Sequence, residues 1–354
     1  MADADLSACS GPPEDIATGI GLRIGAIFII GFSSLATTLF PVITKRVPRL
    51  AVPEAIFNFA KYFGSGVIIA TAFIHLLGPG IEELGSPCLS EDFQKYPFAL
   101  AFSMIAMFVL FFVELMSFRI GAGLASKLAY DPHVGGHHHA NEHAVPRSGP
   151  VPSAKDEEEN VDLSESPRTI EKANSDEEVG VIDPTQAGLS AAASEILGVM
   201  ILEFGVIFHS VIIGITLGTT KNDEFTTLFI VLIFHQAFEG LGLGTRLALL
   251  PLPKKSWIPF IGGISYAWVT PIGIAIGLGI RSSYNESSAT ANYVTGTFDS
   301  VSSGILLYTG LVELLAHEFI FNEKMRTAPL GKVLLSVFEM LLGAGLMALL
   351  GYWA

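Results

Sequence analysis

The chain has 354 residues, of which 50% are hydrophobic and 15% charged, and it carries a formal net charge of −14. Soluble domains carry about 25% charged residues, so this composition excludes an ordinary soluble protein. The mean hydropathy of +0.53 and the surplus of acid predict a lipid bilayer as the main surrounding and no nucleic-acid partner.

Apolar runs of about 20 residues recur along the chain, and each is long enough to cross a bilayer core of about 30 Å. Lipid would leave the backbone of an open strand without hydrogen-bond partners, so the runs should be helices. We therefore predict an all-α polytopic membrane protein with eight transmembrane helices in a 3+2+3 arrangement. The predicted spans are 20–42, 55–78, 97–120, 190–218, 225–250, 256–280, 298–321 and 332–353.

The first part of the chain is predicted as an extracellular tail, 1–19, followed by three spans in 20–120. Cys9 in the tail and Cys88 between spans two and three are the only cysteines. An oxidising compartment would permit a disulfide between them; the alternative is two unrelated thiols.

A long segment, 121–189, separates spans three and four. It is acidic and nearly free of aromatic residues, so we predict a disordered cytosolic loop. Its stretch "DPHVGGHHHANEH" is typical of a flexible tract that binds metal weakly and has a regulatory role. The alternative is a solvated polar segment that binds no metal. The histidines are His133, His137, His138, His139 and His143.

Spans four and five, within 190–250, carry the strongest chemical signal. His209 and His235 fall at similar depth on adjacent antiparallel helices, and Glu239 shares a face with His235 because it follows four residues later. Ionisable groups at such depth are costly and usually functional. Two imidazoles and a carboxylate suit Zn²⁺, so we predict a metal site; a hydrogen-bonded His–Glu pair that fastens helices is the alternative.

Other ionisable residues outline a polar route through the membrane, partly in the three spans of 251–354. For each one, lining of the route and structural bonding between helices both remain open. The four candidates are His75, Glu203, Glu313 and His317.

The distribution of basic residues predicts that both termini are extracellular. The short loops on one side of the membrane hold ten lysines and arginines, against four on the other side. The sequon Asn285-Glu286-Ser287 then falls outside, where Asn285 can be glycosylated, and so do both cysteines.

At this point the sequence resembles a known family. "HSVIIGITLG" (His209–Gly218) and "HQAFEGLGLG" (His235–Gly244) are similar to helices four and five of the Zrt/Irt-like (ZIP) divalent-metal transporters. Eight spans and a histidine-rich loop after the third complete the pattern. "GSGVIIATAFIHLL" and "YTGLVELLAHEF" resemble the fungal plasma-membrane zinc-uptake carriers most.

The resemblance implies a central transport site. Ser210 and Gln236 match positions that hold a second ion in two-metal relatives. The sequence departs from the family motif "HNxPEG" at Ile213, where those relatives have a carboxylate, and it lacks the motif's proline. A single transported ion is therefore favoured. The residues that match the primary ligands are His209, His235 and Glu239.

The resemblance further implies a secondary carrier, not an enzyme, that imports Zn²⁺ into the cytosol as its substrate, without a catalytic cofactor. It also implies an inverted repeat and, in many members, a homodimer. Fe²⁺, Mn²⁺ and Cd²⁺ accept similar ligands, and iron is the main alternative ion. Two other classes stay open: an intramembrane zinc hydrolase, although the chain has no H-E-x-x-H, and a metal sensor that uses the histidine-rich loop.

Overall fold

The computed structural model describes Cys9 and residues 19–125, 184–283, 285 and 288–353. This described part is helical and has no strand, and eight of its helices are long and apolar enough to span a membrane, which confirms the predicted fold class. Short helices connect them: η1 (Pro48–Leu50), α5 (Glu91–Lys95) and α11 (Glu323–Arg326). The spans are α2 (Ile20–Arg46), α3–η2–α4 (Glu54–Leu84), α6 (Phe98–Ala125), α7 (Pro184–Thr219), α8 (Asn222–Leu249), α9 (Ile258–Ile280), α10–η3 (Ala289–Phe321) and α12 (Leu330–Leu350).

Several helices extend beyond the predicted spans. The seventh span begins at Ala289 instead of residue 298, and the second continues past residue 78 to Leu84. Both extensions are polar, and they pack against each other, so burial between helices replaces the apolar run that the prediction relied on. Helices α6 and α7 likewise extend into the segment predicted as the loop, to Ala125 and from Pro184. The histidine-rich tract lies outside the described residues.

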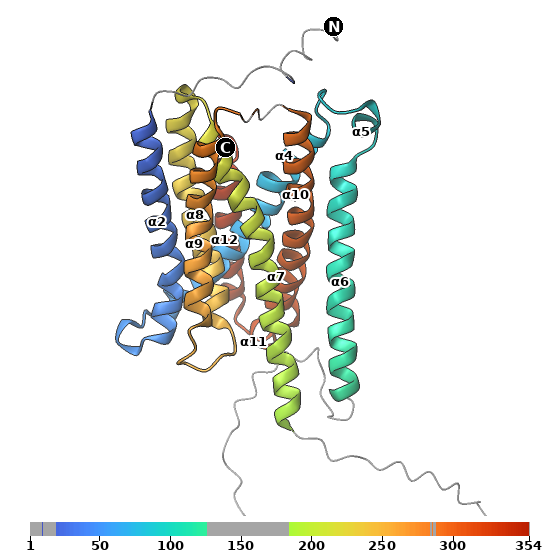
Figure 1. Cartoon of the computed structure of the whole chain (residues 1–354). Helices are drawn as coiled ribbons and strands as arrows, with labels where there is room; N and C mark the ends of the chain where they lie inside the picture. The colour runs from blue at the N-terminus through green and yellow to red at the C-terminus, as the bar shows by residue number, and fades with distance from the viewer. Residues whose placement is uncertain (1–8, 10–18, 126–183, 284, 286–287, 354) are drawn as a thin grey trace, which may run out of the picture.

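The spans form two packing groups that do not follow chain order. Figure 1 shows α2, α8 and α9 toward one side of the molecule and α6 and α10 toward the other. Helices α2, α7, α8 and α9 pack together, and we call them the first bundle. The second bundle consists of α3–η2–α4, α6, α10–η3 and α12, in which α12 packs on α3, and α10 packs on α4 and α6. The bundles meet where α8 contacts α3 and where α7 contacts α10.

Glycine pairs allow α7 and α9 of the first bundle to pack backbone against backbone. A Cβ built on Gly214 would lie 2.9 Å from the Cα of Gly273, and one on Gly218 would lie 2.8 Å from the Cα of Gly277. Small residues four apart are the usual way for membrane helices to come this close. The pair Gly214 and Gly218 on α7 therefore faces the pair Gly273 and Gly277 on α9. This contact fixes α7, which carries His209, against α9.

Arg23 of α2 is fully buried and closes the turn between α7 and α8. Its guanidinium donates to the carbonyl oxygens of Leu217 (3.1 Å), Gly218 (3.2 Å) and Thr220 (2.5 Å), and to the side-chain oxygen of Asn222 (3.1 Å). The last carbonyls of a helix lack partners within the helix, and a cation there also complements the helix dipole. Arg23 therefore holds the connection between the two helices that carry His209 and His235.

The surface of the bundle is apolar and its interior is partly polar. Phe108, Met200 and Leu341 are 61–63% exposed, whereas the described core encloses buried histidine, arginine and carboxylate side chains. This distribution suits a surface in contact with lipid tails, where intramembrane polar groups face the interior of the bundle.

Two spans contain a π-helical stretch, η2 (Thr71–Leu77) in span two and η3 (Thr309–Phe321) in span seven. Such stretches are rare and occur frequently at functional sites. The first one turns His75 toward His235, with 4.6 Å between the ring centroids.

Candidate metal centre

His209, His235 and Glu239 converge between α7 and α8. One ligand atom from each lies within 4.8 Å of the other two, and the three residues are only 1–2% exposed. The Nε2 of His235 lies 3.3 Å from Oε1 of Glu239, and the two imidazole centroids lie 5.6 Å apart. The structure therefore brings together the three residues that the sequence predicts as metal ligands.

The polar atoms of these three residues are poorly satisfied. Both ring nitrogens of His209, both of His235 and Oε1 of Glu239 are buried without a hydrogen-bond partner. Buried polar groups nearly always have partners, so a cluster of orphaned donors and acceptors needs an explanation. A divalent cation would provide one, because each of these atoms is a ligand type that Zn²⁺ accepts.

The neighbouring positions Ser210 and Gln236 are also buried, but only Ser210 has an unpartnered oxygen. The amide of Gln236 donates to the hydroxyl of Thr270 and accepts from that of Tyr266 at 3.1 Å. Tyr266 also donates to Oε2 of Glu239 at 3.3 Å. Helix α9 thus holds Gln236 and orients Glu239, so the amide is engaged in bonding between helices.

Ile213, which replaces the carboxylate of the family motif, packs with the hydrophobic cluster of Ala26, Ile30 and Phe225. An aliphatic side chain in an apolar cluster offers no ligand. The arrangement around the trio thus has the donors for one cation and lacks the carboxylate that would complete a second site.

Two residues of the second bundle flank the trio. His75 is 6% exposed, and its Nε2 lies 2.9 Å from the carbonyl oxygen of Met347. Asp299 of α10 is 3% exposed, and its Oδ1 lies 3.6 Å from Nδ1 of His209 without a hydrogen-bond partner. The sequence analysis missed Asp299 and Tyr266. Asp299 could have been found as an acid within the predicted seventh span, whereas a tyrosine in an apolar run gives no such signal.

Two other predicted route residues, Glu203 and His317, are not part of the trio's cluster of ligand atoms. The carboxylate of Glu203 faces α9, where a Cβ on Gly262 would lie 3.4 Å from both of its oxygens. The ring of His317 lies 5.9 Å from that of Phe321. Their part in transport stays a prediction.

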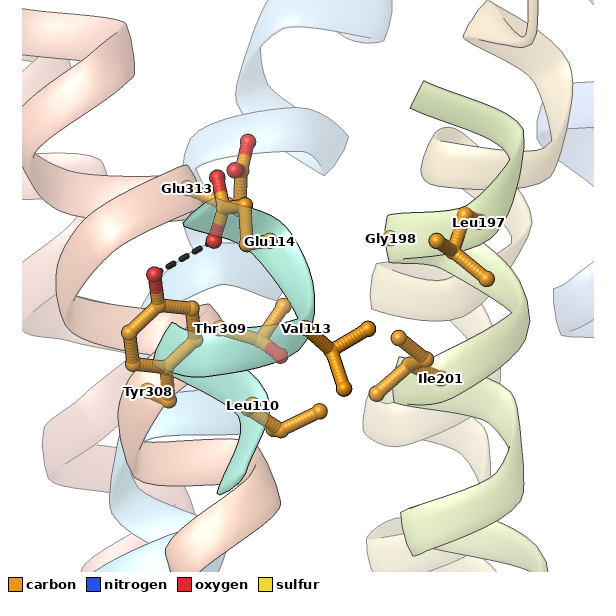
Figure 2. Close-up of a pocket in the computed structure, with 9 residues that line it drawn as sticks. All are labelled: Leu110, Val113, Glu114, Leu197, Gly198, Ile201, Tyr308, Thr309 and Glu313. Atoms are coloured by element: carbon orange, nitrogen blue, oxygen red, sulfur yellow. Dashed lines mark hydrogen bonds between the residues drawn. The ribbon is translucent and has the colours of Figure 1, made fainter. Parts of the chain in front are cut away.

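Glu313, the remaining route candidate, lines a pocket between α6, α7 and η3 (Figure 2). Glu114 lines the same pocket and accepts a hydrogen bond from the hydroxyl of Tyr308. Two carboxylates therefore lie among otherwise mostly apolar side chains at this junction between the bundles. The pocket is lined by Leu110, Val113, Glu114, Leu197, Gly198, Ile201, Tyr308, Thr309 and Glu313.

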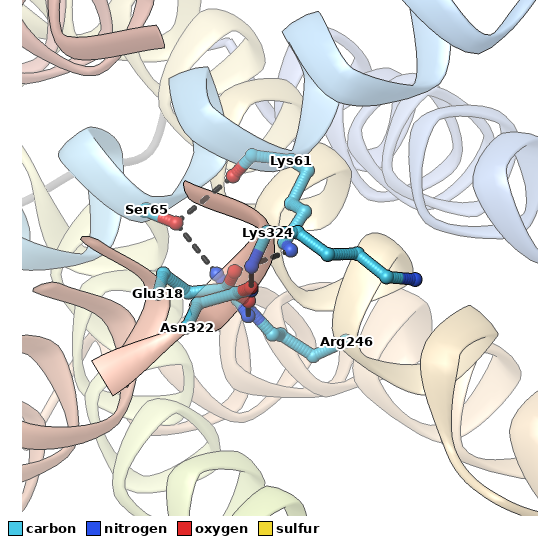
Figure 3. Close-up of polar contacts among 6 residues, drawn as sticks. All are labelled: Lys61, Ser65, Arg246, Glu318, Asn322 and Lys324. Carbon is cyan, nitrogen blue, oxygen red and sulfur yellow. Dashed lines mark hydrogen bonds and ion pairs between the residues drawn. The ribbon is translucent and has the colours of Figure 1, made fainter. Parts of the chain in front are cut away.

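An ionic cluster joins the two bundles near the start of α3 and the ends of α8 and η3 (Figure 3). Glu318 of η3 pairs with Lys61 of α3 at 2.5 Å and with Arg246 of α8 at 3.1 Å. Arg246 also donates to the hydroxyl of Ser65 at 2.6 Å. All three charged side chains are at most 15% exposed, so two largely buried cations share one carboxylate.

This sharing predicts an order of stability losses. Glu318→Gln leaves two cations without their acid and should lower the free energy of unfolding by about 3 kcal/mol. Arg246→Gln removes hydrogen bonds to Glu318 and Ser65 but leaves the Lys61–Glu318 pair intact, and it should cost about 1 kcal/mol. Thermal unfolding of the purified variants in detergent would measure both, and equal losses would contradict the shared carboxylate.

Two features mark the face at which α2 begins. Cys9 is joined to Cys88 by a disulfide, which is one of the two alternatives that the sequence leaves open. Asn285, the predicted glycosylation position, lies between α9 and α10. The loop with Cys88 follows the second span and the loop with Asn285 follows the sixth, so both loops lie on the same face.

Eight spanning helices around a buried set of two imidazoles and a carboxylate define a polytopic membrane protein of the kind that could bind a divalent cation within the bilayer. The chain belongs to the ZIP zinc transporter family, whose sequence profile matches residues 20–351. This match confirms the resemblance drawn from the two helix motifs.

Individual relatives agree with this assignment. Zinc-regulated transporter 1 of Saccharomyces cerevisiae is 40% identical, with 95% of this chain and 88% of the relative covered. Zinc-regulated transporter 2 of the same organism is 37% identical, with 94% of each chain covered. Fe(2+) transport protein 2 of Oryza sativa subsp. japonica is 30% identical, with 98% of this chain and 90% of the relative covered.

Proposed function

We propose that this protein is a secondary carrier that imports Zn²⁺ across the plasma membrane into the cytosol. The observation that carries the proposal is the buried trio His209, His235 and Glu239, whose unpartnered donors lie within 4.8 Å of one another. The names of the fungal relatives support zinc as the ion.

The trio suits a carrier because it lies on the first bundle and faces the second. All three ligands are 1–2% exposed, so a bound ion would be shut off from water and the bundles must move to release it. We propose alternating access by relative movement of the bundles, with His75 on the outer route, and Glu203, Glu313 and His317 on the inner one. An inward-negative potential favours entry of a divalent ion by about 4.6 kcal/mol per 100 mV.

We propose that both termini lie outside, so that the face at which α2 begins is the outer one. The excess of basic residues in the loops of the opposite face supports it. The Cys9–Cys88 disulfide supports it as well, since disulfides persist in oxidising compartments. Glycosylation of Asn285 would give a direct test of which face is outside.

We infer one transported ion per site and a carrier in place of a hydrolase. Ile213 and the engaged amide of Gln236 support the single ion. Membership of a transporter family supports the carrier. The histidine-rich loop, 121–189 in the prediction, is proposed to bind metal for regulation, and a homodimer stays a prediction.

Fe²⁺ is the second candidate ion, because a relative with nearly complete coverage is named an iron transport protein. We expect purified protein in liposomes to move Zn²⁺ inward and saturably, and a tenfold excess of Fe²⁺ to reduce this flux less than twofold. A zinc-sensitive dye inside the vesicles would report the flux, and vesicles without protein are the control. Stronger inhibition by Fe²⁺, with Fe²⁺ itself taken up, would assign iron instead; absence of any metal flux would contradict the carrier.

A further inference from the structure

We propose that Glu83 and Asp299 form a second cation site, a waiting site that binds the incoming divalent ion and passes it to His209. This inference rests on the proposed import function and adds a site to it. Glu83 comes from α4, beyond the end of the predicted second span, and Asp299 comes from α10, just inside the start of the predicted seventh span.

The two helices approach each other closely at this point. A Cβ built on Gly296 of α10 would lie 3.1 Å from the Cβ of Glu83, and one built on Gly80 of α4 would lie 2.7 Å from Oγ of Ser300. Asp299 follows Gly296 by three residues, so it lies one turn deeper on the same side of α10. The carboxyl groups of Glu83 and Asp299 are near enough to repel each other when both are charged.

Neither carboxyl group is fully satisfied by the protein. Oε2 of Glu83 and Oδ1 of Asp299 are buried without a hydrogen-bond partner, and Asp299 is only 3% exposed. Two charged carboxylates within electrostatic range of each other and largely shielded from water are unfavourable unless a proton or a cation compensates them. A divalent ion would neutralise both charges, and carboxylate oxygens are ligands for Zn²⁺, Fe²⁺ and Mn²⁺ alike.

The site leads directly to the trio. Oδ1 of Asp299 lies 3.6 Å from Nδ1 of His209, which is itself 1% exposed and unpartnered. Toward the outer face, the amide of Asn292 on α10 donates to the hydroxyl of Ser86, two residues beyond the end of α4, at 2.9 Å. Polar groups thus continue from the loop that contains Cys88 down to the metal centre.

The placement on two bundles gives the transfer a direction. Glu83 and Asp299 belong to the second bundle, whereas His209, His235 and Glu239 belong to the first. A cation held between Asp299 and His209 can exchange one carboxylate oxygen for the imidazoles of the trio. When the first bundle moves inward, the ion moves with it and the waiting site stays behind, ready for the next ion.

Kinetics in cells that lack their own zinc uptake would test the role. Glu83→Gln and Asp299→Asn should raise KM for Zn²⁺ at least tenfold and leave the maximal rate within about twofold of the unmutated chain, after correction for surface protein. The double variant should resemble the single ones, because either change removes the same site. Glu82→Gln, the matched control at the exposed neighbouring residue, should keep KM unchanged.

A binding measurement keeps the proposal testable if these variants fold poorly. Purified Glu83→Cys/Asp299→Cys protein should give a Cd²⁺–thiolate absorption band with the intensity of two thiolates at one ion per chain, and Glu82→Cys/Asp299→Cys should give at most half of that intensity. Absence of the band would overturn the site, and unchanged KM in both single variants would overturn the transfer role. A failure of the import proposal itself is distinguishable, because then the unmutated chain would take up no zinc.

Discussion

Glu239→Gln should abolish zinc uptake, by more than about 100-fold, in protein that still reaches the cell surface. The amide keeps the size of the carboxyl group, and its oxygen can still accept from Tyr266, so the fold should hold. The change removes the only negative charge of the trio and leaves a divalent ion with two neutral imidazoles in a dry site. Initial rates of radioactive zinc uptake, divided by surface-labelled protein, would measure the loss.

The matched control is Glu224→Gln, which makes the same chemical change in the exposed first turn of the same helix. It should leave uptake within about twofold of the unmutated chain. His235→Ala should fail as Glu239→Gln does, because it removes a ligand and leaves the acid unpaired. Normal uptake by both variants at normal surface levels would remove the trio from the mechanism.

The helical architecture and the trio could be predicted from sequence because both depend on local patterns. A run of about 20 apolar residues specifies a spanning helix on its own, since lipid permits few alternatives. His235 and Glu239 are four residues apart on one helix, so their shared face needs no tertiary information. Only the position of His209 on α7 required an estimate of its depth in the membrane relative to His235. The short connection between α7 and α8 made that estimate reliable.

The parts that prediction missed depend on contacts between distant segments. The start of α10, "ATANYVTGT", is too polar to predict a membrane span, and it is helical because it packs against α4. Asp299 is part of the site because it lies beside His209, which is 90 residues earlier in the chain. Tyr266 is part of it because its hydroxyl donates to Gln236 and Glu239 on another helix. The π-helical stretches, one of which aims His75 at His235, have no signal in hydropathy or helical period.

Gly343→Ala should be strongly destabilising for a change of a single methyl group, with about 3 kcal/mol lost from the free energy of unfolding. A Cβ at this position would lie 2.1 Å from the carbonyl oxygen of Phe63 on α3. A backbone atom cannot move aside as a flexible side chain can, so α12 and α3 must separate. Gly66 faces α12 in the same way, with Met340 O at 1.8 Å from its added Cβ, so the crossing is tight on both sides.

Gly345, two residues further along α12, provides the control because a Cβ there meets nothing within 4 Å. Alanine favours a helix over glycine by about 1 kcal/mol at either position, so Gly345→Ala should be neutral or slightly stabilising. The difference between the two variants therefore isolates the steric effect from the change in helix propensity. Size-exclusion chromatography of heated, detergent-solubilised protein would show Gly343→Ala aggregating at a lower temperature than the unmutated chain. Equal thermal stability of the two variants would mean that α3 and α12 do not cross as closely as the structure places them.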